Sequence, residues 1–197
     1  YTHQAVFSYP VTGGIEALIH AMAAPVKENI LTGFQVSSIS GQEGQYVVSD
    51  GTRTLTADRI ISTIPLQNLI PCLDGIPDEV RKAVADLKYN SVMAIGIGIQ
   101  GTVPPYSWAY IPDAGASLAN RISFPSNFSD TTAPEGCSSI LAEITYNEGD
   151  EISRMTDADV TDHIISSLSS LGLFTMDRVI ATQITRNKFA YVVYDLD

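Results

Sequence analysis

The 197-residue chain carries 22 acidic and 11 basic residues, which gives it a net charge of −11 at pH 7. Such a charge repels a phosphate backbone, so we expect no nucleic-acid partner, and no apolar run reaches the roughly 18 residues of a membrane-spanning helix. The content of 45% hydrophobic and 17% charged residues is typical of a globular protein. Cys72 and Cys137 make no metal-binding pattern, so we expect free thiols in a reducing cytoplasm and no metal site.

The first predicted element is a helix over 15–22. Four apolar residues share one of its faces: Ile15, Leu18, Ile19 and Met22. Gly13 and Gly14 stand just before it, where free N–H groups could bind a phosphate or where glycine could simply open the helix. The dinucleotide-binding pattern GxGxxG is absent, so the spacing alone favours a plain helix start.

A β-meander is predicted next. Short strands are expected at 33–40, 45–49 and 53–57, with Asp50-Gly51 as a hairpin turn between the last two. The apolar run at 59–64 predicts a buried strand that ends at Pro65.

The second half mixes helices and strands. Helices are predicted at 78–87 and after a capping box at Thr156. The second of these helices has one apolar face: Val160, Ile164, Leu168 and Leu171. Strands are predicted at 93–99, 107–111, 120–124, 139–146 and 178–185. Because strands and helices do not alternate strictly, the order predicts an α+β (mixed α/β) fold.

The strand at 93–99 has one face made only of Ala94, Gly96 and Gly98. Glycine weakens a strand, so its repeated use indicates that something packs very close to this face. A helix lying on the sheet is the favoured interpretation, and the flat ring of a cofactor or substrate is the alternative.

Trp108 and Tyr110 share one face of a predicted strand, and Arg121 lies on the next strand. Aromatic surface beside an arginine can stack a ring and hold a phosphate or carboxylate, although ordinary packing gives the same pattern. Glu143 is expected on the solvent side of its strand, because an inward carboxylate would need a partner. No histidine stands in a nucleophile motif, so no catalytic residue is assigned.

The chain resembles the flavin-containing amine oxidase and protoporphyrinogen oxidase superfamily in four stretches, in this order: YPVTGGIEALIHAM, VSSI, DG…ADRIISTIPL and YNSVMAIGIGIQG. Three later stretches are most similar to the UDP-galactopyranose mutase branch: SWAYIPD…NRISFPSNFSDTTAPEG, ILAEITY and RNKFAYVVYDLD. The resemblance extends over nearly the whole chain.

The resemblance implies FAD as the cofactor, held by a domain built from separated pieces of the chain. Residues 1–65 would be a partial FAD-binding segment, a helix plus a β-meander. Residues 66–197 would be the substrate-binding domain, a mixed sheet with flanking helices. The GxGxxG segment that grips the pyrophosphate is absent here, so this chain is expected to be part of a longer flavoprotein.

The resemblance also implies roles for single residues near the cofactor. Gly13 and Gly14 would lie on the flavin side, and the backbone of Val36 would pair with the adenine of FAD. Pro65 would end a strand that turns toward the flavin.

On the substrate side, Arg121 matches an arginine that holds the diphosphate in sugar-nucleotide mutases, and Tyr191 matches a tyrosine that contacts the same group. Three positions depart from the mutase pattern: Phe128 in place of tyrosine, Thr185 in place of arginine and Val192 in place of proline. The departures leave fewer phosphate contacts.

Three functions follow as hypotheses. The first is the substrate-side portion of a FAD-dependent oxidoreductase of the amine oxidase/protoporphyrinogen oxidase type, acting on a small molecule. The second is a mutase-like isomerase in which reduced flavin attacks the anomeric carbon of a UDP-sugar. The third is a flavin-free binding module that retains the fold.

Overall fold

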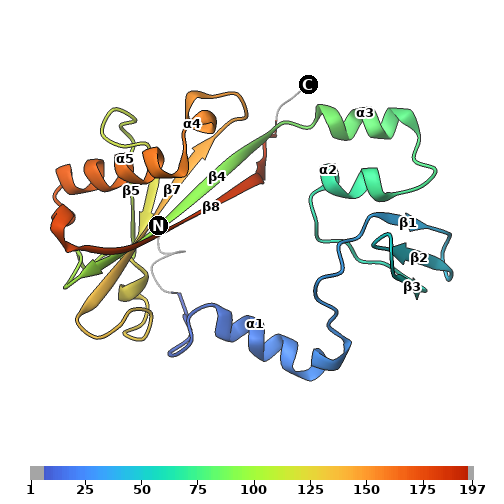
Figure 1. Ribbon diagram of the computed structural model, residues 1–197, viewed down its shortest axis with the longest axis horizontal. Coiled ribbons are helices and arrows are strands. Elements are labelled where there is room, and N and C mark those ends of the chain that lie inside the picture. The colour runs from blue at the N-terminus through green and yellow to red at the C-terminus, as the bar shows by residue number, and fades with distance from the viewer. Residues whose placement is uncertain (1–6, 195–197) are drawn as a thin grey trace. The chain divides into compact units, whose positions relative to one another are not determined.

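A computed structural model describes residues 7–194 and confirms the α+β class (Figure 1). The described chain divides into two compact units, one of residues 7–27 and 89–191 and the other of residues 28–88 and 192–194. The boundary predicted from the sequence, between a FAD-binding segment that ends at residue 65 and a substrate-binding domain that follows it, is a division by function. It stays a prediction.

The larger unit contains a five-stranded sheet in the order β5-β6-β7-β4-β8. Its strands are β4 (Tyr89–Gln100), β5 (Trp108–Tyr110), β6 (Arg121–Ser123), β7 (Cys137–Tyr146) and β8 (Val179–Val192). β5, β6, β7 and β4 pair antiparallel in turn. All five predicted strands are confirmed, with β4 and β8 longer than expected.

One face of this sheet is covered by helix α5 (Asp157–Ser170), as Figure 1 shows. The covered face of β4 carries Met93, Ile95, Ile97 and Ile99, none more than 1% exposed. Val160, Ile164 and Leu168 of α5 are fully buried against them, as their helical spacing predicts. Leu171 does not join this face, because the helix has ended and the side chain is 46% exposed.

The amino end of α5 is capped as predicted. The Thr156 hydroxyl accepts a hydrogen bond from the Asp159 N–H at 3.1 Å and donates to Asp159 Oδ2 at 2.7 Å. The unit also contains three short helical segments: η3 (Pro125–Asn127), α4 (Glu151–Arg154) and η4 (Met176–Arg178).

The opposite face of β4 is open at the small residues. A Cβ built at Gly96 would meet only the Gln183 carbonyl of β8, at 3.8 Å, and one at Gly98 would meet Ala181 and Ile180 of the same strand. The expected helix therefore does not pack on Gly96 and Gly98 within the described residues, because α5 takes the larger apolar face instead. The alternative, a flat ring on this face, stays a prediction.

Helix α1 (Glu16–Ala23) confirms the first predicted helix and runs into η1 (Ala24–Asn29). The chain just before it is held to the larger unit, because the Ser129 and Thr131 hydroxyls donate to the Val11 carbonyl at 2.6 and 2.8 Å. The apolar face of α1 is exposed, with Met22 at 69%.

The smaller unit contains the antiparallel meander β1 (Ser38–Ser40), β2 (Tyr46–Ser49) and β3 (Thr54–Ala57), with β1 shorter than predicted. Helices α2 (Leu66–Leu69), η2 (Ile70–Cys72) and α3 (Asp78–Asp86) follow. Only α3 was expected from the sequence, and no side chain on it is fully buried.

The predicted buried strand at 59–64 is wrong. This segment belongs to no strand in the described residues, and Ile61 is 93% exposed. An apolar run becomes a buried strand only where neighbouring strands pair with it, and the three-stranded meander ends at β3.

The turn between β2 and β3 makes the smaller unit sensitive to acid. Asp50 Oδ1 accepts hydrogen bonds from the backbone N–H of Arg53 at 2.7 Å and of Thr52 at 2.9 Å, and Arg53 Nε donates to Asp50 Oδ2 at 2.7 Å. The Arg53 N–H, followed by the Thr52 N–H, holds the pKa of Asp50 well below its usual value of 3.8.

A depressed pKa in the folded state stabilises the protein above the unfolded pKa, and this stability is lost as the pH falls through the folded value. We expect urea midpoints of the smaller unit to fall less on acidification from about pH 5 in Asp50→Asn than in the wild type. Circular dichroism at a series of pH values measures this difference, and parallel curves for the two proteins would contradict it.

Candidate functional site

A cavity of about 170 Å³ lies on the face of the five-stranded sheet that α5 does not cover. Its lining residues come from all five strands and the residue before β6: Val92, Tyr110, Asn120, Arg121, Glu143, Thr145 and Tyr191. Three of the four predicted substrate residues, Tyr110, Arg121 and Tyr191, thus meet in one place although they are far apart in sequence.

The centre of this cavity is an ion pair between Arg121 and Glu143. Arg121 Nε donates to Glu143 Oε2 at 2.5 Å, and Nη2 donates to Oε1 at 2.6 Å. The Glu143 carboxylate, together with the Tyr110 phenol, raises the pKa of Arg121 above its ordinary value. The guanidinium is therefore fixed in orientation and always charged, which suits it to hold a planar hydrogen-bonding group of a ligand.

Glu143 was not assigned to a site from the sequence. The alternation of β7 correctly places it on the face opposite Ile140 and Ile144, which we interpreted as the solvent side. Its side chain is only 18% exposed, because the strand register sets it directly opposite Arg121. A single glutamate in an otherwise apolar strand is the sequence feature that could have indicated a site. Its partner, Arg121, could be named only from the pairing of β6 with β7.

Trp108 lies on β5 but does not line the cavity. It packs instead against Phe7, with ring centroids 5.8 Å apart. The ring centroids of Phe7 and Tyr9 lie 5.2 and 5.3 Å from the ring centroid of Phe128. The Trp108 side chain therefore belongs to an aromatic cluster that holds the chain before α1, and a substrate contact for it stays a prediction.

Two of the predicted cofactor residues, Val36 and Pro65, line one cavity of about 660 Å³ in the smaller unit. Phe34, Ile64 and Pro71 give this cavity apolar walls. The Val36 carbonyl accepts from the Cys72 thiol at 3.6 Å, and among the described residues no acceptor bonds to the Val36 N–H.

The same cavity holds an unsatisfied donor. Gln67 lines it, and its Nε2 is buried without a hydrogen-bond partner among the described residues. A buried donor without an acceptor costs about 1–3 kcal/mol, so such an atom indicates a missing partner. A ligand atom that accepts a hydrogen bond would satisfy this donor.

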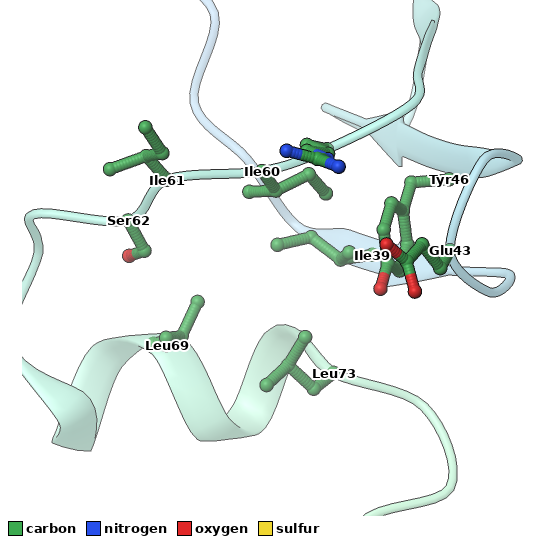
Figure 2. A pocket seen from close by; sticks show the side chains of 9 residues that line it. Ile39, Glu43, Tyr46, Ile60, Ile61, Ser62, Leu69 and Leu73 are labelled. Carbon is green, nitrogen blue, oxygen red and sulfur yellow. The ribbon is translucent and has the colours of Figure 1, made fainter.

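Figure 2 shows a further cavity of the smaller unit, about 550 Å³ in volume. Leu69 and Leu73 point from the helical segment toward Ile39 and Ile60, while Ile61 points away. Glu43 and Tyr46 lie together at one end. This cavity is chiefly apolar, and none of the predicted site residues lines it.

Gly13 and Gly14 have positive φ angles of 77° and 61°, which only glycine adopts readily, and they stand before α1 as predicted. They belong to the larger unit, whereas Val36 and Pro65 belong to the smaller one. Gly14 accepts from the Ala17 N–H at 3.2 Å through its carbonyl, so the glycines do open a helix. A cofactor contact at this helix start stays a prediction.

Within residues 7–194, no group of three or more His, Cys, Asp or Glu side chains is arranged to hold a metal ion. None of the helices described there is long and apolar enough to cross a membrane.

The chain is similar to several flavoenzymes of known structure or function. Flavin-dependent L-tryptophan oxidase RebO from Lentzea aerocolonigenes is 31% identical over 90 residues, which are 42% of this chain and 19% of the oxidase. Reduced UDP-galactopyranose mutase matches 93% of this chain with a TM-score of 0.79 and 25% identity. Putrescine oxidase bound to putrescine matches 88% with a TM-score of 0.67 and 12% identity, which shows the shared fold alone.

The chain spans only part of these proteins, 41% of the mutase and 38% of putrescine oxidase. The family model of the flavin containing amine oxidoreductases matches residues 2–194, nearly the whole chain. The resemblance seen in the sequence is thereby confirmed, and the chain belongs to the flavin containing amine oxidoreductase family.

Proposed function

We propose that this chain is the substrate-side portion of a FAD-dependent oxidoreductase of the amine oxidase/protoporphyrinogen oxidase type. The single observation that carries the proposal is the cavity lined by Val36, Pro65 and Gln67, in which Gln67 Nε2 lies buried without a partner. Family membership supports a flavin as the missing partner.

The residues of this cavity fit the adenine end of FAD. The Val36 N–H and Gln67 Nε2 would donate to ring nitrogens, and Phe34 and Pro65 would cover the apolar ring faces. Gly13 and Gly14 stay proposed contacts on the flavin side. When bound, the flavin supplies the redox chemistry, while the protein binds and orients the substrate and excludes water.

The proposed substrate residues are Tyr110, Arg121 and Tyr191, with Glu143 added by the structure. Trp108 does not line their cavity and stays a proposed contact. Their cavity of about 170 Å³ suits one end of a small molecule.

The flavin content of the protein expressed from its complete reading frame tests this proposal. We expect a flavin absorption spectrum, and we expect Gln67→Leu to weaken FAD binding about two- to tenfold, the effect of one neutral hydrogen bond. Gln42→Leu is the matched control, since Gln42 is exposed in the turn before β2. A protein without flavin would favour the flavin-free binding module instead.

A UDP-galactopyranose mutase-like isomerase is the second candidate. It is favoured by the meeting of Arg121 and Tyr191 in one cavity and by the match to the mutase over 93% of this chain. In this case the substrate would be a nucleotide sugar, and UDP would bind to the protein. Arg121→Ala would then weaken UDP binding about ten- to hundredfold, while the exposed Arg154→Ala would not.

Anaerobic mixing separates the two candidates. An oxidoreductase substrate, such as an amine, bleaches the oxidised flavin, whereas UDP-galactopyranose does not. Conversion of the UDP-sugar only after chemical reduction of the flavin would establish the isomerase.

A further inference from the structure

Two oppositely charged side chains face each other on the open face of the five-stranded sheet. Arg121 of β6 and Glu143 of β7 are direct partners in the antiparallel register. Two hydrogen bonds of 2.5 and 2.6 Å engage both carboxylate oxygens. This bidentate arrangement is the strong form of an arginine–carboxylate interaction, and the strand register builds it into the fold.

The charges of the pair cancel each other. Among the described residues that line the cavity, only Arg121 and Glu143 are charged at neutral pH, in a protein whose net charge is −11. A phosphate approaching Arg121 would lie beside the Glu143 carboxylate. Because that side chain is only 18% exposed, water screens the repulsion between the two anions poorly.

We propose that Glu143 is a specificity-determining residue that excludes anionic ligand groups from this cavity, which instead takes an uncharged hydrogen-bonding group such as a hydroxyl, a carbonyl or an amide. An acceptor on such a group meets the N–H groups of Arg121 that Glu143 leaves unused. The volume of about 170 Å³ fits the end of a small molecule.

This inference rests on the proposed substrate-side role of the cavity, and it favours the oxidoreductase over the mutase. A UDP-sugar carries a diphosphate, which would have to displace Glu143 from Arg121 or bind beside it.

Calorimetric titration of the full chain with inorganic pyrophosphate tests the role of Glu143. We expect Glu143→Gln to bind pyrophosphate at least about tenfold more tightly than the wild type, because the amide can keep one hydrogen bond but leaves the Arg121 charge uncompensated. Glu148→Gln is the matched control: it removes the same charge from a side chain that is 69% exposed and pairs with Lys188. This control should bind as the wild type does.

Two outcomes overturn the inference: wild-type binding as tight as that of Glu143→Gln, or an equal gain in Glu148→Gln. A second measurement needs no variant. UDP and uridine should bind the wild type equally or not at all, and a clear preference for UDP overturns the inference. Flavin content reads out the proposed function separately, so a flavin-bearing protein that prefers UDP refutes the role of Glu143 alone.

Discussion

Replacing Leu168 by alanine is expected to lower the free energy of unfolding of the larger unit by about 2–5 kcal/mol. Leu168 is fully buried, in the face of α5 that packs on the sheet. The substitution removes buried apolar surface and leaves a cavity, because the surrounding β-sheet cannot collapse into the space. Urea unfolding followed by the fluorescence of Trp108, the single tryptophan of the chain, reports on this unit.

Leu171→Ala provides the control for this experiment. It is the same change three residues further on, at a side chain that is 46% exposed. We expect an effect of at most about 1 kcal/mol. Equal losses in the two variants would mean that α5 does not pack on the sheet through Leu168.

The turn before β2 gives the second large effect. Gly41 has a φ of 99°, and a Cβ added there would lie 2.2 Å from the Gln45 carbonyl oxygen. Gly41→Ala therefore combines an unfavourable left-handed backbone, about 1–2 kcal/mol, with a backbone displacement of about 1–3 kcal/mol. We expect this sum to unfold the meander, which circular dichroism detects.

Gly44→Ala separates the two contributions. Gly44 also has a positive φ, 83°, but nothing lies within 4 Å of an added Cβ. It should cost about 1 kcal/mol, the backbone contribution reduced by the lower entropy of the unfolded chain. The unfolding transition of the larger unit, followed by Trp108 fluorescence, serves as an internal reference in both variants, because Trp108 lies outside the smaller unit. If Gly41→Ala is as stable as Gly44→Ala, residue 41 does not lie as close to the Gln45 carbonyl oxygen as the structure places it.

Periodicity in the sequence was enough to predict most of the elements. The alternation of Met93, Ile95 and Ile97 and the helical spacing of Val160 and Ile164 named the two sides of the main core correctly. The same reasoning failed at 59–64, because an apolar run shows that burial is favourable but not which strand will pair with it.

The candidate site was predictable only in part. The sequence named Tyr110, Arg121 and Tyr191, but their meeting in one cavity depends on the strand order β5-β6-β7-β4-β8. Glu143 and Gln67 were missed for the same reason. The partner of Glu143 is set by a register between strands, and the burial of Gln67 Nε2 depends on how the segments of the smaller unit pack.

The interruption of the larger unit by residues 28–88 has a consequence for the order of folding. On the ribosome residues 28–88 are synthesised before most of the larger unit, yet Ile39 is the only buried apolar side chain of the smaller unit among the described residues. The Val11 carbonyl cannot accept its hydrogen bonds within the larger unit until Ser129 and Thr131 have been synthesised. Contacts between such distant residues form slowly, because a long loop must close before they can stabilise anything. The segment before α1 therefore stays unattached for much of synthesis, a period in which the nascent chain is open to chaperones and to aggregation.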